Sequence, residues 1–278
     1  MTLLAVSAGL TGQVPLADRG FAYGDGLFET MAVREGQIRL LDGHLRRLQE
    51  GLERLAIGGL SAAELAGPLS AAAQASRRLP ACEAGAVLKL VVTRGEGPRG
   101  YAPPPTAVPH WWIQAFPWVP PPENPLPARV RTSTVRLAPQ PLLAGLKHLN
   151  RLEQVLARQQ DPAPQADEIL MLDHDGYLTC AGAANVFLVH RGELVTPLLD
   201  RCGVAGVVRQ ALLDASAAGG IPWRATVRRI VPAELADAEE MFLTNALRGV
   251  WAVGAVDGNP FPTGSVAAGL TRWWRELR

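Results

Sequence analysis

Cysteine is scarce in this chain of 278 residues: there are three, Cys82, Cys180 and Cys202, and they are widely spaced. An odd, scattered set without a CxxC pair argues against a disulfide framework and against a zinc site. The net charge is only +1, which excludes a strong field attracting nucleic acid or an anionic membrane. Apolar runs fall short of the roughly 18 residues of a membrane span, and no basic segment introduces a signal peptide. We expect a soluble, cytoplasmic protein without nucleic-acid or membrane partners.

The composition is nevertheless that of a folded protein, with 48% hydrophobic and 19% charged residues. Proline is concentrated in WVPPPENPLP, residues 118–127. Neither a helix nor a central strand tolerates such a run. We interpret it as a linker between an N-terminal domain of residues 1–117 and a larger domain of residues 128–278.

Hydrophobic periodicity predicts a mixture of strands and helices. In the first half it predicts strands at 28–33, 37–41, 86–93 and 110–116, a helix capped by Asp42 with the stripe Leu45, Leu48, Leu52 and Leu55, and a capping box at Ser61 and Glu64. In the second half it predicts strands at 168–172, 177–180, 184–190 and 193–196, and helices at 149–160 and 207–218. This mixture favours an α+β fold with largely antiparallel sheets.

Lys147 lies in LAGLKHLNRLEQVLARQQ, just before the predicted helix, with His148 beside it and Arg151 one turn on. A lysine chosen at random is usually solvated. Here, however, a cation at a helix N-terminus would oppose the macrodipole, and neighbouring cations and burial would lower the pKa of the amine. Such an amine can form a Schiff base with a carbonyl compound, pyridoxal 5'-phosphate (PLP) included.

PLP would also require a phosphate-binding site, and three segments are candidates. GVAG, residues 203–206, precedes a predicted helix whose N-terminal N–H groups suit an anion. FLTNALRGV places Thr244 and Asn245 at a strand end, and HLRRL contains Arg47. Taken singly, each is as well explained by a turn or by a solvated arginine.

Together, these segments resemble a known superfamily. In order along the chain they are RGFAYGDGLFET (19–30), HLRRL (44–48), TRGEGPRGY (93–101), GLKHLNRLEQVLAR (145–158), AANVF (183–187), GVAGVVRQ (203–210) and LTNAL (243–247). They are similar to the class IV aminotransferases, PLP-dependent enzymes of fold type IV. GLKHLNRLEQVL and RGEGPRGY resemble the 4-amino-4-deoxychorismate lyases of folate biosynthesis, which make 4-aminobenzoate and pyruvate, more than the D-amino acid or branched-chain transaminases.

The resemblance implies a fold and an assembly. The expected fold is a two-domain fold type IV, with a small N-terminal α/β domain and a larger, β-rich C-terminal domain that binds PLP. The expected assembly is a homodimer, with the active site between the domains and near the subunit interface. The expected substrate is a small molecule, aminodeoxychorismate.

The resemblance also implies roles for individual residues. Lys147 would hold PLP as a Schiff base and shuttle the proton, and Thr30 would assist the elimination. The cofactor would further be bound by Arg47, Arg151, Asn185, Val204, Ala205, Asn245 and Ala246. Arg94, Arg99 and Tyr101 would lie near the substrate, which carries two carboxylates of the kind that arginine grips with two hydrogen bonds. The alternative for the TRGEGPRGY segment is a solvated basic loop.

Cys180 departs from the superfamily pattern. It occupies the position of a glutamate that pairs with the protonated pyridine nitrogen of PLP, five residues before Asn185. A thiol is a poor replacement for a carboxylate, because its ordinary pKa is near 8.5. Three interpretations are open. Cys180 faces the PLP ring, which then withdraws electrons less strongly; or another carboxylate takes the place of the glutamate; or the protein has lost activity. We favour the first, because an elimination driven by aromatisation depends less on electron withdrawal by the PLP ring than transamination does. A class IV transaminase and a PLP-binding homologue with reduced activity are the rival interpretations.

Overall fold

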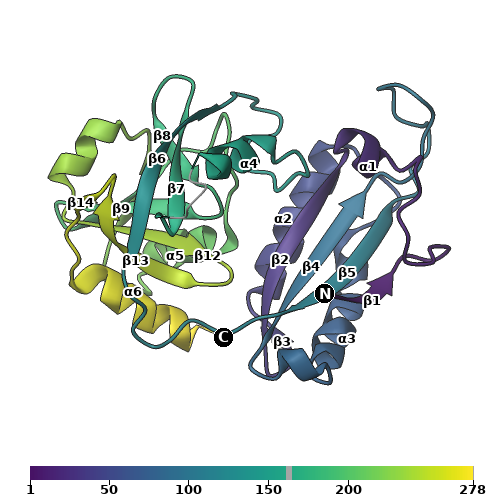
Figure 1. Cartoon of the computed structure of the whole chain (residues 1–278), viewed down its shortest axis with the longest axis horizontal. Helices are drawn as coiled ribbons and strands as arrows, with labels where there is room; N and C mark the ends of the chain where they lie inside the picture. The colour runs from purple at the N-terminus through teal and green to yellow at the C-terminus, as the bar shows by residue number, and fades with distance from the viewer. Residues whose placement is uncertain (161–164, 278) are drawn as a thin grey trace. The chain divides into compact units, whose positions relative to one another are not determined.

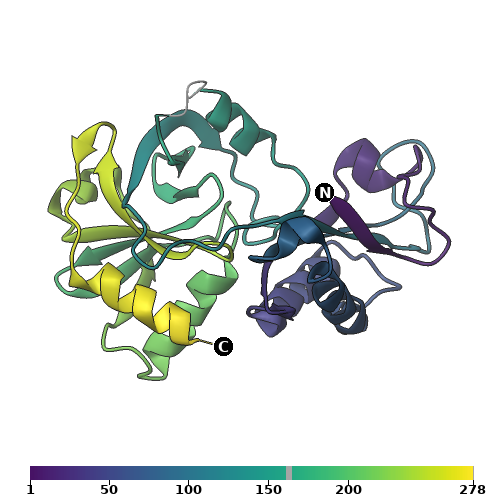
Figure 2. The ribbon, with the colours of Figure 1, turned by 60° about the horizontal axis from the view of Figure 1, so that its bottom comes forward.

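The computed structural model describes residues 1–160 and 165–277, which form two compact units (Figures 1 and 2). Of these residues, the first unit contains 1–120 and 146–150, and the second contains 121–145, 151–160 and 165–277. The first break falls at Pro120, within the proline-rich run. The proposed domain limits of 1–117 and 128–278 stay a prediction.

The first unit is an antiparallel sheet in the order β1-β5-β4-β2-β3. Its strands are β1 (Thr2–Val6), β2 (Gly26–Arg34), β3 (Gln37–Ile38), β4 (Ala86–Thr93) and β5 (His110–Pro117). Its helices are α1 (Arg19–Tyr23), α2 (Leu41–Arg54) and α3 (Ala66–Ser76), with short 3-10 turns at Ala62–Leu65 and Pro80–Cys82. Figure 2 shows α2 and α3 on one face of the sheet. The apolar core lies between these two helices and the sheet.

The helix predicted after residue 42 is confirmed, but its start is different. Leu48 and Leu52 are buried in the core, and Leu45 and Leu55 pack against it. Leu40, in the left-handed region at φ 53°, is the residue before the first turn, so Asp42 is not the cap and lies inside the first turn instead. The strand predicted at 37–41 is correspondingly cut to two residues. The capping box of Ser61 and Glu64 is present.

The second unit is a mixed sheet in the order β11-β10-β9-β12-β13-β6-β7-β8, with β14 on β13. Its strands are β6 (Ala128–Leu137), β7 (Glu168–Asp173), β8 (Leu178–Ala181), β9 (Asn185–His190), β10 (Glu193–Pro197), β11 (Ala225–Arg228), β12 (Glu240–Asn245), β13 (Gly249–Val256) and β14 (Asn259–Pro260). Its helices are α4 (Leu152–Gln159), α5 (Val207–Ala217) and α6 (Ser265–Glu276), with a 3-10 turn at Pro232–Asp237. The α+β class is confirmed, but β6 is parallel to both β7 and β13, and β10 to β11, so the expectation of largely antiparallel pairing fits the first unit better.

The helix predicted at 149–160 begins later than expected. Helix α4 starts at Leu152, with Arg151 before its first turn. Lys147 therefore does not lie at a helix N-terminus, and no helix macrodipole opposes its charge there. Among the described residues, no helix is both long and apolar enough to cross a membrane.

Candidate active site

Residues 147–149 run along β2 in the first unit instead of starting a helix. The N–H of Phe28 donates to the carbonyl of Lys147 (2.9 Å), and the N–H of Leu149 donates to the carbonyl of Gly26 (3.0 Å). This edge of β2 is available because β3 pairs only with Val33 and Arg34. The pairing places the half-buried Lys147 ammonium 4.2 Å from the centroid of the Phe28 ring.

A second lysine lies on the same face of the sheet. The ammonium of Lys89, on β4, is 5.8 Å from the centroid of the Phe28 ring. Thr30 is the residue opposite Lys89 in the ladder, and side chains alternate along a strand, so Thr30 shares this face with Phe28. The structure thus groups Lys147 and Thr30, which the sequence predicted, with Lys89, which it did not. The available signal was a lysine interrupting the apolar run VLKLVV.

The opposite face of β2 carries a buried ionic cluster. Glu29 accepts hydrogen bonds from Nε of Arg47 (2.8 Å) and from its terminal nitrogen, and it contacts Nδ1 of His44 at 2.6 Å. Burial by itself would raise the pKa of Glu29, but Arg47 and His44 lower it to about 2. Burial lowers the pKa of His44, and the Lys147 ammonium adds to that effect. The cluster therefore lies within electrostatic range of Lys147.

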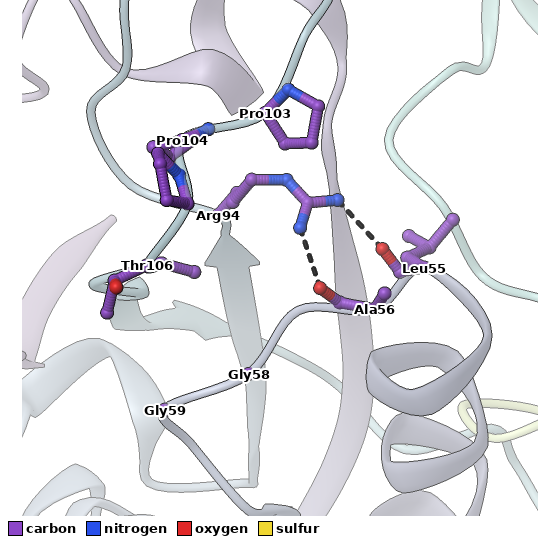
Figure 3. Close-up of a pocket in the computed structure, with 10 residues that line it drawn as sticks. Leu55, Ala56, Gly58, Gly59, Arg94, Pro103, Pro104 and Thr106 are labelled. Carbon is purple, nitrogen blue, oxygen red and sulfur yellow. Dashed lines mark hydrogen bonds between the residues drawn. The ribbon is translucent and has the colours of Figure 1, made fainter.

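Arg94 is buried and its guanidinium is largely occupied within the first unit. It donates from Nε (2.8 Å) and one terminal nitrogen (3.0 Å) to Asp25, and to the carbonyls of Leu55 and Ala56 at the end of α2 (both 2.8 Å). Figure 3 shows the two carbonyl contacts in a pocket bordered by Pro103 and neighbouring residues. A substrate contact by Arg94 stays a prediction, and it would have to use the one remaining N–H.

Arg99 and Tyr101 lie on an exposed loop, residues 98–107, here called the 98–107 loop. Arg99 is exposed, and 87% of the Tyr101 surface is accessible. The Tyr101 ring meets the ring of Tyr23 edge-on, with centroids 5.6 Å apart. Both side chains are thus available to a ligand, as a substrate-binding role requires.

In the second unit, Asn185 ties the segment 204–206 to the sheet. Its side-chain nitrogen donates to the carbonyl of Val204 (2.8 Å), and its oxygen accepts from the N–H of Gly206 (3.0 Å). Only glycine fits at position 206, because a Cβ there would lie 2.0 Å from the Asn185 oxygen. The N–H of Ala205 donates to the carbonyl of Gly145 (2.9 Å). The Ala205 N–H is therefore engaged in the structure, whereas among the described residues the Val204 N–H has no partner.

A polar cradle lies beside this segment. Thr244 pairs with Asn185 across β9 and β12, so their side chains share one face. The buried hydroxyl of Thr244 has no hydrogen-bond partner among the described residues. Helix α5 begins after Gly206 without a side-chain cap, so its first N–H groups lack the partner that a capping residue would supply. Asn245 organises the adjacent turn by accepting from the N–H groups of Leu247 (3.0 Å) and Arg248 (2.8 Å), and Ala246 lies inside that turn.

Cys180 is buried on β8, with 5% of its surface accessible. Burial, and next the nearby Cys202, raise the pKa of its thiol to about 12, while Arg151 acts in the opposite direction. Burial lowers the pKa of Arg151. Cys180 is therefore a neutral thiol near neutral pH. Arg151 lies close enough to it to interact electrostatically.

Glu168 is a buried carboxylate that sequence reasoning did not identify. It accepts from the N–H groups of Ile169 (3.0 Å) and Ala183 (3.2 Å) and from Arg158 (3.0 Å). Burial raises its pKa in spite of these contacts, and its charge contributes to the raised pKa of Cys180. Its oxygens are occupied by these donors, so it is not positioned as a freely available replacement for the missing glutamate.

The family model for class IV amino-transferases matches residues 26–256 of the chain. The chain belongs to the class IV aminotransferase family. An aminodeoxychorismate lyase from Vibrio harveyi is 32% identical over 266 residues, covering 92% of this chain and 94% of the relative. A D-alanine aminotransferase from Bacillus licheniformis is 26% identical over 253 residues, covering 91% and 86%.

Solved structures of this class IV family share the fold. The crystal structure of a 4-amino-4-deoxychorismate lyase from Pseudomonas aeruginosa superposes with a TM-score of 0.87 at 45% sequence identity, covering 98% of both chains. The predicted two-domain fold type IV is therefore confirmed.

Class IV aminotransferases and aminodeoxychorismate lyases depend on PLP, and the residues of this chain fit that cofactor. The unpartnered Thr244 hydroxyl and the uncapped start of α5 are donors of the type that phosphate requires. Lys147 supplies an amine next to an aromatic ring. Cys180 is the exception, since a neutral thiol cannot provide the charge of a carboxylate.

Proposed function

We propose that this chain is a PLP-dependent lyase that converts 4-amino-4-deoxychorismate to 4-aminobenzoate and pyruvate, a reaction of folate biosynthesis. The observation that carries the proposal is the pair of ammonium groups, Lys147 and Lys89, on one face of β2 and β4. A nucleophilic amine beside a second cation suits an amine-bearing dicarboxylate. The 45% identity to a lyase over 98% of the chain supports the same activity.

The cofactor phosphate is bound, in this proposal, by the N–H of Val204, the first turn of α5 and the Thr244 hydroxyl, with Asn185 holding the segment in place. Ala205, Asn245 and Ala246 border the site. A cofactor contact by Arg47, whose guanidinium is paired with Glu29 in the first unit, stays a prediction. Lys147 is two residues from Gly145, whose backbone bonds to Gly203 and Ala205. The covalent chain alone keeps the Cα atoms of Lys147 and Gly145 within about 7.6 Å.

Residues of the first unit bind the substrate and move its proton. Lys89 and Arg99 neutralise the two carboxylates, and Tyr101 contacts the ring. PLP, when bound, would supply an electron-withdrawing ring for the carbon that bears the substrate amine. The Lys147 amine takes the proton from that carbon, the bond between the ring carbon and the enolpyruvyl oxygen breaks, and Thr30 donates a hydrogen bond to the departing oxygen. The proton held by Lys147 returns to the enolpyruvate, which becomes pyruvate. Aromatisation of the ring drives the elimination.

The test uses purified protein reconstituted with PLP. The expected result is a yellow protein that forms fluorescent 4-aminobenzoate from aminodeoxychorismate, whereas Lys147→Ala is inactive and borohydride no longer fixes the cofactor. A yellow wild-type protein that makes no 4-aminobenzoate but exchanges amino groups between D- or branched-chain amino acids and 2-oxo acids would overturn the proposal in favour of a transaminase.

We also propose that the active protein is a cytoplasmic homodimer. Leu16 precedes α1 and Phe21 lies on it, and they expose 85% and 67% of their surfaces. Exposed apolar side chains that gather in one patch mark interaction sites. Light scattering after gel filtration should give twice the mass of the chain. The Phe21→Glu variant should shift the protein toward the monomer.

A further inference from the structure

Arg19 binds the backbone of the 98–107 loop from helix α1. Its terminal nitrogens donate to three successive carbonyls, those of Gly100 (3.0 Å), Tyr101 (2.9 Å) and Ala102 (3.3 Å). Its Nε donates to Asp25 (2.9 Å), and its guanidinium lies 4.9 Å from the centroid of the Tyr23 ring. The side chain is buried, with 4% of its surface accessible.

The loop has little else to hold it. Among the described residues, positions 98–107 make no hydrogen bond from backbone to backbone. Four of them are prolines, Pro98, Pro103, Pro104 and Pro105, which have no N–H to donate. The N–H of Gly100 donates to the Tyr23 hydroxyl (3.0 Å). Helix α1, which lies beside the loop in Figures 1 and 2, therefore supplies its anchoring contacts through Arg19 and Tyr23.

The same arginine connects the loop to the segment that carries Lys147. One oxygen of Asp25 accepts from Nε of both Arg19 and Arg94, and the other oxygen accepts from a terminal nitrogen of Arg94. The next residue, Gly26, accepts the N–H of Leu149, and Phe28 donates to Lys147. The path from the loop carbonyls to the Lys147 peptide thus consists of Arg19, Asp25 and the first residues of β2.

We propose that Arg19 is a positioning residue for substrate binding, which fixes Arg99 and Tyr101 relative to Lys147 without touching the substrate. This inference rests on the proposed function, because it takes Arg99 and Tyr101 as substrate contacts. The shape of the guanidinium is essential, since it spreads five donors in a plane across three carbonyls and a carboxylate. The compact ammonium of lysine reaches Asp25 or the loop, but not both.

Steady-state kinetics of the reconstituted enzyme form the first arm of the test. Arg19→Lys should raise KM for aminodeoxychorismate roughly tenfold or more, as expected for lost hydrogen bonds. The value of kcat should change less than threefold, and the visible spectrum and PLP affinity should stay those of the wild type. The control is Arg78→Lys, which changes an exposed arginine two residues after the end of α3 and should change none of these quantities.

Proteolysis forms a second arm that does not depend on activity. Trypsin cleaves a loop when the segment around the scissile bond can unfold locally. Cleavage after Arg99, located by mass spectrometry, should be at least tenfold faster in Arg19→Lys than in the wild type and in Arg78→Lys. Tyr23→Phe, which removes only the hydroxyl bond to Gly100, should give an intermediate rate and serves as the probe if Arg19→Lys does not fold.

The two arms separate the inference from the proposed function. A wild-type protein without lyase activity would refute the proposed function. Faster cleavage after Arg99 in Arg19→Lys would then still identify Arg19 as the anchor of the loop. Unchanged cleavage in folded Arg19→Lys and Tyr23→Phe proteins would overturn the inference, whatever the activity. An unchanged KM together with faster cleavage would also overturn it, because the loop would then be released without consequence for the substrate.

Discussion

The guanidinium of Arg47 and the carboxylate of Glu29 form a buried pair in which both carboxylate oxygens accept hydrogen bonds from the arginine. His44 adds a third contact to the same carboxylate. Breaking a buried pair by neutralising one partner typically costs about 3–5 kcal/mol, because the other charge is left uncompensated. Glu29→Gln should therefore lower the free energy of unfolding by about 3 kcal/mol in urea titrations. Glu50→Gln, on the exposed face of α2, should have almost no effect.

The pair also predicts a pH dependence. Glu29 has a pKa of about 2 in the folded protein, against an ordinary value of 4.5. Because the folded-state pKa is depressed, the stabilisation is fully present above about pH 4.5 and is lost as the pH falls toward 2. The difference in Tm between wild type and Glu29→Gln should be constant from pH 5 to 7 and should narrow below pH 4.5. A difference in Tm that widens on acidification would contradict the lowered pKa of Glu29.

Thr244 is expected to matter for the cofactor and not for folding. Its buried hydroxyl has no partner among the described residues, so the apoprotein gains nothing from it, and valine has the same shape. Thr244→Val should leave the apoprotein as stable as wild type or slightly more stable. The dissociation constant for PLP should rise roughly 10- to 150-fold, since a hydrogen bond to a charged group is worth about 1.5–3 kcal/mol. Thermal unfolding and PLP titration measure the two effects separately. A destabilised apoprotein with unchanged PLP affinity would mean that the hydroxyl is structural.

Cys180 is expected to select between two reactions. Its thiol, with a pKa of about 12, is neutral at pH 7 and cannot stabilise a protonated pyridine ring. Elimination assisted by aromatisation tolerates this loss better than transamination does. Cys180→Glu should therefore raise the ratio of transaminase to lyase activity, measured on the same preparation with an amino acid and with aminodeoxychorismate. Cys180→Ser, of similar size and without charge, should leave the ratio near that of the wild type. An unchanged ratio in Cys180→Glu would make the hypothesis wrong.

Lys89 is expected to bind a substrate carboxylate. Lys89→Met retains much of the side-chain volume and removes the charge beside Phe28. KM for aminodeoxychorismate should rise roughly tenfold or more, while the visible spectrum of the bound cofactor stays the same. Arg34→Met, at the exposed end of β2, is the matched control. A change in the spectrum instead of in KM would place Lys89 against the cofactor.

Local sequence patterns predicted the elements whose packing is local. The leucine stripe of α2, the capping box at Ser61 and the strand Ala86–Thr93 follow from spacing alone. The conformation around Lys147 does not, because residues 147–149 bond to Gly26 and Phe28, more than a hundred positions away. Nothing in LAGLKHLNRLEQ indicates that β3 is too short to occupy that edge of β2.

The candidate site shows the same limit. The resemblance selected Lys147, Thr30 and Asn185, and the structure gives each of them a defined setting, although their catalytic or binding roles stay predictions. It also selected Arg94, whose guanidinium is mostly committed to Asp25 and the end of α2. The sequence analysis assigned no role to Lys89, or to Arg19 within RGFAYGDGLFET, because the roles proposed for them depend on neighbours that the fold brings close and that are distant along the chain.

The return of residues 146–150 to the first unit has a consequence for how the protein is made. Leu146 is part of the core of that unit, and Gly26 and Phe28 are paired by the residues that follow it. A nascent chain that has emerged only to Pro120 therefore lacks one core side chain and leaves a strand edge open to other chains. The N-terminal unit can complete its folding only after the ribosome has already synthesised β6 of the second, so a gene cut at the proline-rich run should yield an aggregation-prone fragment.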